Sequence, residues 1–506
     1  MSGPAIRWNL LANFLGQFWR AALSLLLVPF YLRILGVEAY GLVGLYASLQ
    51  VALALLDGGL RPALARSTAR FMGGAITPTE LRTLLRSAEC LLVAVVVVIV
   101  GTMALAAPWL AQHWVSPRQL DHATVVQAFT VMGFVAAAQL LESTYDSCLN
   151  GMQRQVLLNA IVTAMATLRG FGALLVLWRW PEVQAYFLWQ AAVSTVSLLA
   201  MRAALYRSLP PAEGRVSFKW QAMTPLRGFA AGTVGITVVA ILLGQSDKYV
   251  IAWLLPLPET GRYTLAASLA TALSFVSGPI VNAFYPRFTE LVARGDVTVL
   301  RRVFHLMARL TAISVGTGAA MFVLFGERLL AVWLHQPALA TEIAPLLALL
   351  APGVLCSALT TVLLALQLAN GLTAAMFKLN LGLLALFLPV LLLSTERFGA
   401  PGAAASYALV NLGGLVAGAA ISFPRLLPGE ARTWWFIDIL RPLLVAFTAA
   451  AALRAILPHP ERWPAEVAIL VAAGAIALGC GVLADPQLRA AAWELRRRRV
   501  NPVRNP

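Results

Sequence analysis

Apolar segments long enough to cross a membrane follow one another almost from end to end of the chain. Of its 506 residues, 60% are hydrophobic and only 12% are charged, whereas about 25% of a soluble globular protein is charged. A helix of roughly 20 apolar residues crosses a hydrocarbon core about 30 Å thick. The segments lack the alternating pattern of barrel strands, so they predict an all-α integral membrane protein.

About fourteen transmembrane helices are expected, joined by connections too short to hold a soluble domain. The first apolar segment is too long for a removable signal peptide and lacks a small-residue cleavage site, so we expect it to remain as a helix. The expected spans are residues 9–32, 39–60, 87–107, 123–147, 156–178, 183–205, 229–254, 262–284, 304–325, 342–368, 372–394, 401–423, 434–456 and 465–484.

Positive charge is concentrated in every second connection. The net charge is +16, and the arginine-rich stretches lie around residues 61–86, 202–227 and 287–302 and in the tail sequence ELRRRRV. The positive-inside rule therefore places both termini in the cytoplasm, in agreement with an even number of spans. This distribution argues against nucleic acid as a partner and favours contact between the tail and anionic membrane lipids, with a specific tail partner as the alternative.

Two halves of the sequence resemble each other. The segment LNGMQ around Asn150 matches ANGLT around Asn370, and YASL matches AASL with the same offset of 220 residues (370 − 150). The segment FLGQFWRAALSLLLVPF also aligns with LLGQSDKYVIAWLL, which places Arg20 opposite Lys248. Repeats of this kind are common in transporters. They predict two six-helix bundles of parallel topology followed by two extra helices.

The expected organisation follows from these repeats and from the positions of the charged connections. An N-terminal bundle, a cytoplasmic connection, a C-terminal bundle, two additional helices and a basic cytoplasmic tail occupy, in this order, residues 1–206, 207–228, 229–425, 426–485 and 486–506.

A few charged residues interrupt the expected spans. A lone charge near the bilayer centre costs about 2.5 to 3.5 kcal/mol on insertion scales, so such side chains face a partner or a water-filled cavity. They are therefore the candidate site residues. The candidates are Arg20, Asp57, Glu142, Asp146, Arg169, Asp247 and Lys248.

The cationic candidates are suited to an anionic diphosphate. Arg20 and Lys248 occupy matching places, so a two-fold arrangement would bring both to the midplane, where arginine binds phosphate oxygens bidentately and lysine acts as a point charge. Arg169 is a further candidate, and a structural ion pair is the alternative. Asp247 is expected to pair with Arg20, Arg169 or another helix, because adjacent residues on a helix do not face each other.

The acidic candidates suggest an ion site. Glu142 and Asp146 are four residues apart, so both carboxylates lie on one helical face and can share a proton or bind a cation. The alternative is a solvated pair at the cytoplasmic end, matched to Arg154. Asp57 is a third candidate for ion coupling, although Arg61 is a local partner for it.

Catalytic and cofactor motifs are not found in the sequence. Its lysines, Lys219, Lys248 and Lys378, lie outside any phosphate-binding loop, and no HExxH, GxSxG or CxxC motif occurs. We therefore expect a protein that is not an enzyme and that uses no cofactor or metal. Transport would draw on a gradient of H⁺ or Na⁺, on the substrate gradient or on later consumption of the product.

Two stretches resemble one family of transporters. The opening NLLANFLGQFWRAALSLLLVPFYLRILGVEAYGLVGLYASLQVALALLDGGLRPALAR is similar to the start of the polysaccharide transporter family, the oligosaccharide and O-antigen flippases. The shared features are an early Asn, Pro and Tyr at the far end of the first helix, LG followed by YG, and an acidic residue with GL before an arginine-rich loop. SDKYVIAWLLPLPETGRYTLAASL and YPRFTELVARGD resemble the middle segment of that family.

This resemblance implies two bundles around a central cavity that opens alternately to each side of the bacterial inner membrane. The implied substrate is an undecaprenyl-diphosphate-linked oligosaccharide, flipped to the periplasmic leaflet for lipopolysaccharide, capsule or exopolysaccharide synthesis. Polymerase or ligase machinery would be a partner. The alternatives are a drug or peptidoglycan-precursor exporter of the same superfamily, or a membrane polymerase or ligase. The last two helices are expected to pack on the bundle, line a groove for the prenyl tail or bind a partner enzyme.

Overall fold

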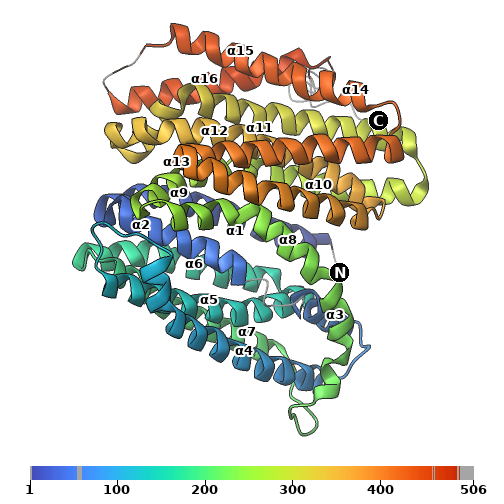
Figure 1. The fold of residues 1–506 in the computed structure, drawn as a ribbon. Helices are drawn as coiled ribbons and strands as arrows, with labels where there is room; N and C mark the ends of the chain where they lie inside the picture. Colours follow the sequence, from blue (N-terminus) through green and yellow to red (C-terminus); the bar gives the residue numbers. More distant parts are fainter. Residues whose placement is uncertain (1–2, 54–59, 459, 461, 487–488, 490–506) are drawn as a thin grey trace. The chain divides into compact units, whose positions relative to one another are not determined.

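The computed structural model is helical throughout the part of the chain that it describes, which is residues 3–53, 60–458, 460, 462–486 and 489 (Figure 1). Eleven helices in this part are long and apolar enough to cross a membrane. One of them, Ala374–Leu426, contains two successive spans joined at Gly399, whose φ is 65°. The prediction of an all-α, multi-pass membrane protein is confirmed.

The contacts divide the chain into two compact units. The N-terminal unit, Met1–Thr264, is organised around α5, which packs against α3, α4 and α7 (Figure 1). Its elements are α1 (Gly3–Leu26), α2 (Val28–Leu53), α3 (Leu60–Met72), α4 (Pro78–His113), α5 (His122–Gly151), α6 (Gln155–Arg179), α7 (Val183–Ser208), the 3₁₀ turn η2 (Trp220–Met223) and α8 (Thr224–Leu254).

Local signals set several boundaries in this unit. Gly36 has a φ of 80°, a conformation that favours glycine, and it separates the first span from the second within α2. Thr77 and Glu80 form a capping box at the start of α4. Asp121 caps α5, and the hydrogen bond from the Thr124 hydroxyl lowers the pKa of Asp121. Helix boundaries therefore follow from the same residue types that mark them in soluble proteins.

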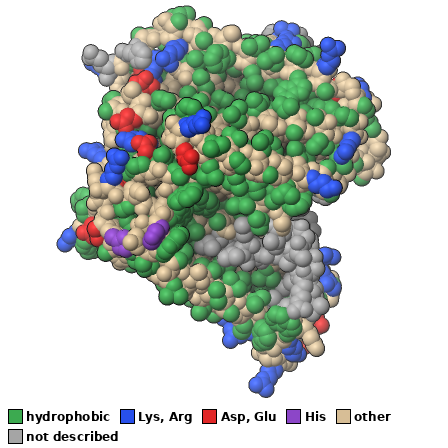
Figure 2. All heavy atoms as spheres, viewed as in Figure 1, with side chains coloured by type: hydrophobic (Ala, Val, Ile, Leu, Met, Phe, Trp, Pro, Cys, Tyr) green, Lys and Arg blue, Asp and Glu red, His purple; other side chains and the backbone are tan. Residues whose placement is uncertain are grey.

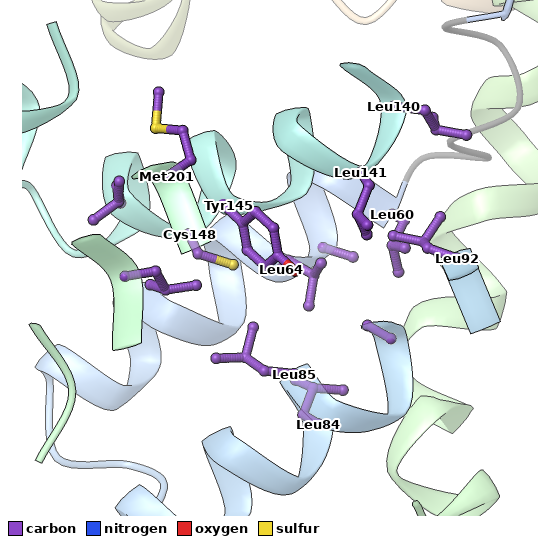
Figure 3. Close-up of a cluster of buried hydrophobic side chains, with 14 of the residues drawn as sticks. Leu60, Leu64, Leu84, Leu85, Leu92, Leu140, Leu141, Tyr145, Cys148 and Met201 are labelled. Atoms are coloured by element: carbon purple, nitrogen blue, oxygen red, sulfur yellow. The ribbon is translucent and has the colours of Figure 1, made fainter. Parts of the chain in front are cut away.

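Helix α3 was not predicted, because its arginines placed it in a cytoplasmic connection. Three of its apolar side chains, Leu60, Ala63 and Leu64, are buried, at 8%, 7% and 0% exposure. Leu64 of α3 lies beside Leu85 of α4 and beside Tyr145 and Cys148 of α5 (Figure 3). One apolar face is thus enough to hold α3 against the bundle.

The C-terminal unit, Leu265–Pro506, is organised around α11, which packs against α10, α12, α15 and α16 (Figure 1). Helix α9 (Leu257–Thr271) crosses the boundary between the units. The remaining elements are α10 (Ser274–Arg294), α11 (Val297–Leu334), α12 (Pro337–Ala369), α13 (Thr373–Leu426), α14 (Ala431–Thr433), the π-helix η3 (Trp434–Leu440), α15 (Arg441–Ile456) and α16 (Trp463–Ala484).

The last two helices pack on the C-terminal bundle, which was one of their three expected roles. Ala450 of α15 and Ala473 and Ala477 of α16 are fully buried in a cluster with Phe325 of α11. Small side chains allow helices in a membrane to approach closely. Together with α12 and α13, the segment 431–443 also lines an apolar cavity of about 480 Å³.

The surface fits a lipid environment. Figure 2 shows hydrophobic side chains spread over the face in view, with lysine and arginine side chains mainly toward its edges. Exposed apolar residues include Leu105, Trp178 and Leu386, at 84%, 86% and 67% exposure. Side chains of this kind at such exposure are typical of helices that face lipid.

We predict that Gly261→Ala destabilises the protein. A Cβ atom at Gly261 would lie 2.1 Å from the backbone oxygen of Val37, where α9 meets α2. Overpacking of this kind costs about 1 to 3 kcal/mol. The control is Gly101→Ala, because a Cβ there meets nothing within 4 Å, and alanine favours a helix by about 1 kcal/mol. Thermal unfolding of both purified variants in detergent measures the difference, and equal midpoints would contradict the prediction.

Candidate functional site

Most of the predicted site residues lie in one group inside the N-terminal unit, which we call the N-terminal polar cluster. Five helices contribute charged or hydroxyl side chains to it, and each side chain interacts with at least one other member. The members are Arg20 of α1, Arg61 of α3, Glu142 and Asp146 of α5, Arg169 of α6, and Ser194 and Ser197 of α7.

The two carboxylates of α5 lie on one helical face, as predicted, and each is matched by arginine. Glu142 accepts a hydrogen bond from the Ser197 hydroxyl at 2.5 Å, and the charge of Arg169 acts on it. The charges of Arg61 and Arg20 act on Asp146. The expected alternative, a pair matched to Arg154, is therefore not needed to explain these acids.

The position of the pair along α5 places it inside the span. The helix ends at Gly151, so at 1.5 Å per residue Asp146 and Glu142 lie about 8 and 14 Å from its end. Both residues are half-buried. Carboxylates at this depth need compensating charge, because desolvation penalises the ionised form.

Arg169 keeps unused hydrogen-bonding capacity. Its Nη2 donates to Ser194 Oγ at 3.2 Å, whereas its buried Nε has no hydrogen-bond partner among the described residues. Gln190 of α7 is 2% exposed and its Oε1 is likewise without such a partner. Two polar atoms on neighbouring helices are thus available to a polar ligand or to water.

The polar face of α7 was not predicted from the sequence. Gln190, Ser194 and Ser197 are 2%, 0% and 0% exposed, and their spacing of four and three residues places them on one face. This spacing is visible in the segment QAAVSTVS. It could have been recognised as a polar stripe in an otherwise apolar helix.

Uncharged polar residues extend the cluster toward α2. Gln50 Nε2 lies 2.5 Å from Gln139 Oε1 and 2.6 Å from the Tyr46 hydroxyl. Gln139 precedes Glu142 by three residues on α5, so it shares the face of the acids. Amide and phenol groups of this kind can exchange hydrogen bonds with neutral hydroxyl groups.

Arg20 lies where α1 crosses α6. A Cβ atom at Gly16 would lie 3.0 Å from Asn159 Oδ1 and 3.6 Å from Arg20 Nη1, so the guanidinium lies close to the polar side chains of α6. Trp19 donates to Thr167 Oγ1 at 2.9 Å, which fixes the same crossing. Arg20 itself is half-buried. It therefore combines proximity to Asp146 with partial access.

Asp247 and Lys248 have local partners in the N-terminal unit. Asp247 is 2% exposed and accepts a hydrogen bond from the Tyr263 hydroxyl of α9 at 2.6 Å. Lys248 Nζ lies 3.3 Å from Asp247 Oδ1 and 3.4 Å from the Gly244 oxygen. The expectation that adjacent residues cannot pair was wrong, because the long lysine stem curls back along the helix. The expected partners of Asp247 were Arg20, Arg169 or another helix. The structure shows the last of these, because Tyr263 belongs to α9.

Two further expectations about the candidate residues stay predictions. Asp57 lies outside the residues that the structure describes, so its role in ion coupling stays a prediction. The joint action of Arg20 and Lys248 on one substrate also stays a prediction.

Solved structures of similar fold are membrane transporters. A multidrug resistance MATE family transporter of the MOP superfamily, in an inward-facing conformation, matches with a TM-score of 0.64 at 12% identity, covering 82% of this chain and 96% of that chain. The lipid II flippase MurJ, in an inward closed conformation, matches with a TM-score of 0.69 at 10% identity, covering 93% and 97%. The fold of this chain is therefore similar to that of these membrane transporters.

The sequence places the chain in a family. The family model for polysaccharide biosynthesis proteins matches residues 6–292, which is more than half of the chain, so the chain belongs to that family. This confirms the family resemblance seen in the opening and middle segments. No curated protein sequence matches the chain.

We predict that Tyr263→Phe lowers stability. The substitution removes the donor to the buried Asp247 carboxylate, and an unsatisfied buried group costs about 1 to 3 kcal/mol, more when it is charged. The control is Tyr285→Phe, at a side chain that is 38% exposed. Thermal unfolding in detergent compares the two, and a Tyr263→Phe midpoint equal to that of the control would contradict this role for Tyr263.

Proposed function

We propose that the protein is a flippase that moves an undecaprenyl-diphosphate-linked oligosaccharide across the bacterial inner membrane by alternating access, for lipopolysaccharide, capsule or exopolysaccharide synthesis. Both termini would be cytoplasmic, and polymerase or ligase machinery would receive the product. The family supports the link to polysaccharide synthesis. The fold, similar to that of the lipid II flippase MurJ, supports the transport of a lipid-linked molecule.

The observation that carries the proposal is the unused hydrogen-bonding capacity of Arg169 in the N-terminal polar cluster. Its buried Nε has no hydrogen-bond partner among the described residues, and neither has Oε1 of Gln190 on the neighbouring helix. A buried donor without a partner is costly unless a ligand or water satisfies it. Guanidinium groups bind phosphate oxygens in a planar, bidentate geometry. A diphosphate is the part of the substrate that would satisfy this donor.

The neighbouring uncharged groups suit the glycan. Gln50, Gln139 and Tyr46 present amide and phenol groups beside the arginines. Such groups exchange hydrogen bonds with sugar hydroxyls. The combination of cations with neutral hydrogen-bonding groups fits a substrate that is part phosphate and part sugar better than it fits a hydrophobic drug.

The acids supply a means of ion coupling. Glu142 and Asp146 interact with each other and with separate arginines. Binding of H⁺ or Na⁺ to the pair would weaken the attraction of the two acids for the arginines and leave arginine charge for the substrate, and loss of the ion would restore that attraction. Transport would then follow the ion gradient across the membrane.

The second candidate function is export of another substrate by the same superfamily, either a drug or the peptidoglycan lipid precursor. The fold is shared by multidrug resistance and lipid II transporters. Deletion of the gene distinguishes the candidates. Loss of a surface glycan with accumulation of lipid-linked repeat units supports our proposal, whereas normal glycan with altered drug tolerance supports the exporter.

We predict that Arg20→Gln, Lys248→Gln and Arg169→Gln each fail to restore full glycan delivery in the deletion strain. Loss of one charge-assisted phosphate contact costs about 1.5 to 3 kcal/mol, or roughly 10- to 150-fold in affinity. The control is Arg397→Gln, at an exposed position. Immunoblots of membranes verify that each variant is inserted. Full delivery by an inserted variant removes that residue from the substrate site.

We predict that Glu142→Gln and Asp146→Asn change the response of transport to an imposed pH or sodium gradient. Both substitutions mimic the neutral acid, so the arginines stay released and the gradient loses its effect, while transport down the substrate gradient persists. Flipping of a fluorescent lipid-linked oligosaccharide in proteoliposomes measures this, with Glu396→Gln, at an exposed position, as the control. If the response to the gradient is unchanged, the two acids do not couple transport to the ion and have a structural role only.

A further inference from the structure

The N-terminal unit contains a pocket at the end of α6 and the start of α7, which we call the tryptophan pocket. Its volume is about 620 Å³, and it shares no residue with the N-terminal polar cluster. A volume of this size is typical of small-molecule sites, which combine apolar and aromatic walls with a few polar groups. The aromatic and polar residues of its lining are Gln127 of α5, Trp180 and Glu182 between α6 and α7, and Gln184 and Trp189 of α7.

Trp189 is held in place by α6. Its Nε1 donates to the Leu168 oxygen at 3.2 Å, and a Cβ atom at Gly172 would lie only 2.2 Å from its Cζ2. The indole can therefore lie directly against α6 because residue 172 has no side chain. An aromatic group that is fixed in this way loses little side-chain freedom when a ligand binds, so it is pre-organised for binding.

Trp180 provides a second aromatic surface in the same pocket. It is 53% exposed, and the guanidinium group of Arg179 lies over its ring at 5.1 Å from the centroid. The arginine covers one part of the ring and leaves the rest accessible. The ring of a sugar is apolar on its C–H faces and carries hydroxyl groups at its edge, so it can pack on aromatic groups of this kind.

The polar groups of the pocket suit hydroxyl groups. Gln184 Nε2 donates to Thr124 Oγ1 at 2.7 Å, and this hydrogen bond orients the amide. Glu182 makes no capping hydrogen bond at the start of α7, and both Glu182 and Gln127 are exposed. Amides donate and accept hydrogen bonds, and a carboxylate accepts them. The set therefore matches hydroxyl groups, which also do both.

The charges at the pocket favour a neutral ligand. The guanidinium group of Arg179 already interacts with the Trp180 ring and repels a cationic headgroup there. The carboxylate of Glu182 lines the pocket and repels a phosphate. A tryptophan that only anchors a helix at the membrane interface needs no pocket or polar partner. Trp178, which is 86% exposed and does not line the pocket, is of that kind.

An apolar strip leads from the pocket along α7. Leu188 and Ala192 line the pocket, and Val196 and Leu199 follow at helical spacing. Leu188, Val196 and Leu199 are 51%, 49% and 60% exposed. The pocket lies at the end of a membrane-spanning helix, where lipid headgroups lie, and the strip runs from it into the span. A sugar that is joined to a lipid fits this arrangement better than a free sugar.

We propose that the tryptophan pocket binds the sugar headgroup of a membrane glycolipid. The sugar ring lies against Trp180 and Trp189. Its hydroxyl groups bond to Gln127, Glu182 and Gln184, and the lipid chain follows the apolar strip of α7. The site requires only a glycolipid in the membrane, so it does not rest on the proposed function.

Photo-crosslinking of the full chain in phosphatidylcholine vesicles tests the proposal. The probes are glucosyl and galactosyl diacylglycerols that carry a diazirine on the sugar, and the control lipid is a phosphatidylcholine that carries a diazirine on its headgroup. Mass spectrometry should find the sugar probes on residues 176–192, with several-fold less labelling by the control lipid. Equal labelling of this segment by all the lipids, or no labelling by the sugar probes, overturns the proposal.

Substitutions in the pocket give a second readout. Trp189→Leu should reduce labelling by the sugar probes roughly 2- to 10-fold, as expected for the loss of one aromatic contact. Trp180→Leu and Glu182→Ala should also reduce it, and their exposed positions keep the proposal testable if Trp189→Leu does not fold. The control Trp178→Leu should keep the labelling of the wild type. Equal labelling of all four variants contradicts the proposal.

Competition distinguishes a lipid-bound sugar from a free one. Excess glucose or galactose should leave most of the labelling, because a free sugar has no chain for the strip on α7. Complete competition by the free sugar contradicts the assignment to a glycolipid. None of these measurements requires transport, so their failure is distinct from a failure of the proposed function.

Discussion

The cost of placing charge inside a membrane determines which helices of this protein meet. Each charged side chain in a span needs a counter-charge, a hydrogen-bond donor or water. The N-terminal polar cluster satisfies this requirement by joining five helices of one unit. In the other unit, Arg309 of α11 pairs with Asp438 of η3 and with Asp485 at the end of α16. Apolar packing alone gives little preference for one neighbour over another in lipid, so these polar contacts select the neighbours.

The sequence predicts the helices well because the signals are local. Apolar length identifies the spans, and the non-helical glycines Gly36 and Gly399 lie where the sequence predicts that one span ends and the next begins. The spacing of Glu142 and Asp146 also predicts a shared face, which the structure confirms. Helix α3 was missed because its arginines outweighed a short apolar face that only packing against α4 and α5 reveals.

The partners of the charges could not be predicted, because they depend on contacts between residues far apart in sequence. Arg169 of α6 meets Ser194 of α7, 25 residues away, and Glu142 of α5 meets Ser197, 55 residues away. His305 and Asp438 are 133 residues apart. Neither was singled out in the sequence, since one histidine or acid at the end of a span resembles an ordinary interfacial residue.

The two buried groups of charges differ in how their side chains are used. In the N-terminal polar cluster, Arg169 Nε has no hydrogen-bond partner among the described residues. In the C-terminal unit, the buried Asp438 carboxylate contacts both His305 and Arg309 of α11. A donor without a partner is available to a ligand, whereas charges that face one another across packed helices stabilise a junction. This difference supports the proposal that the first group binds an anionic substrate, and it favours a structural role for the second.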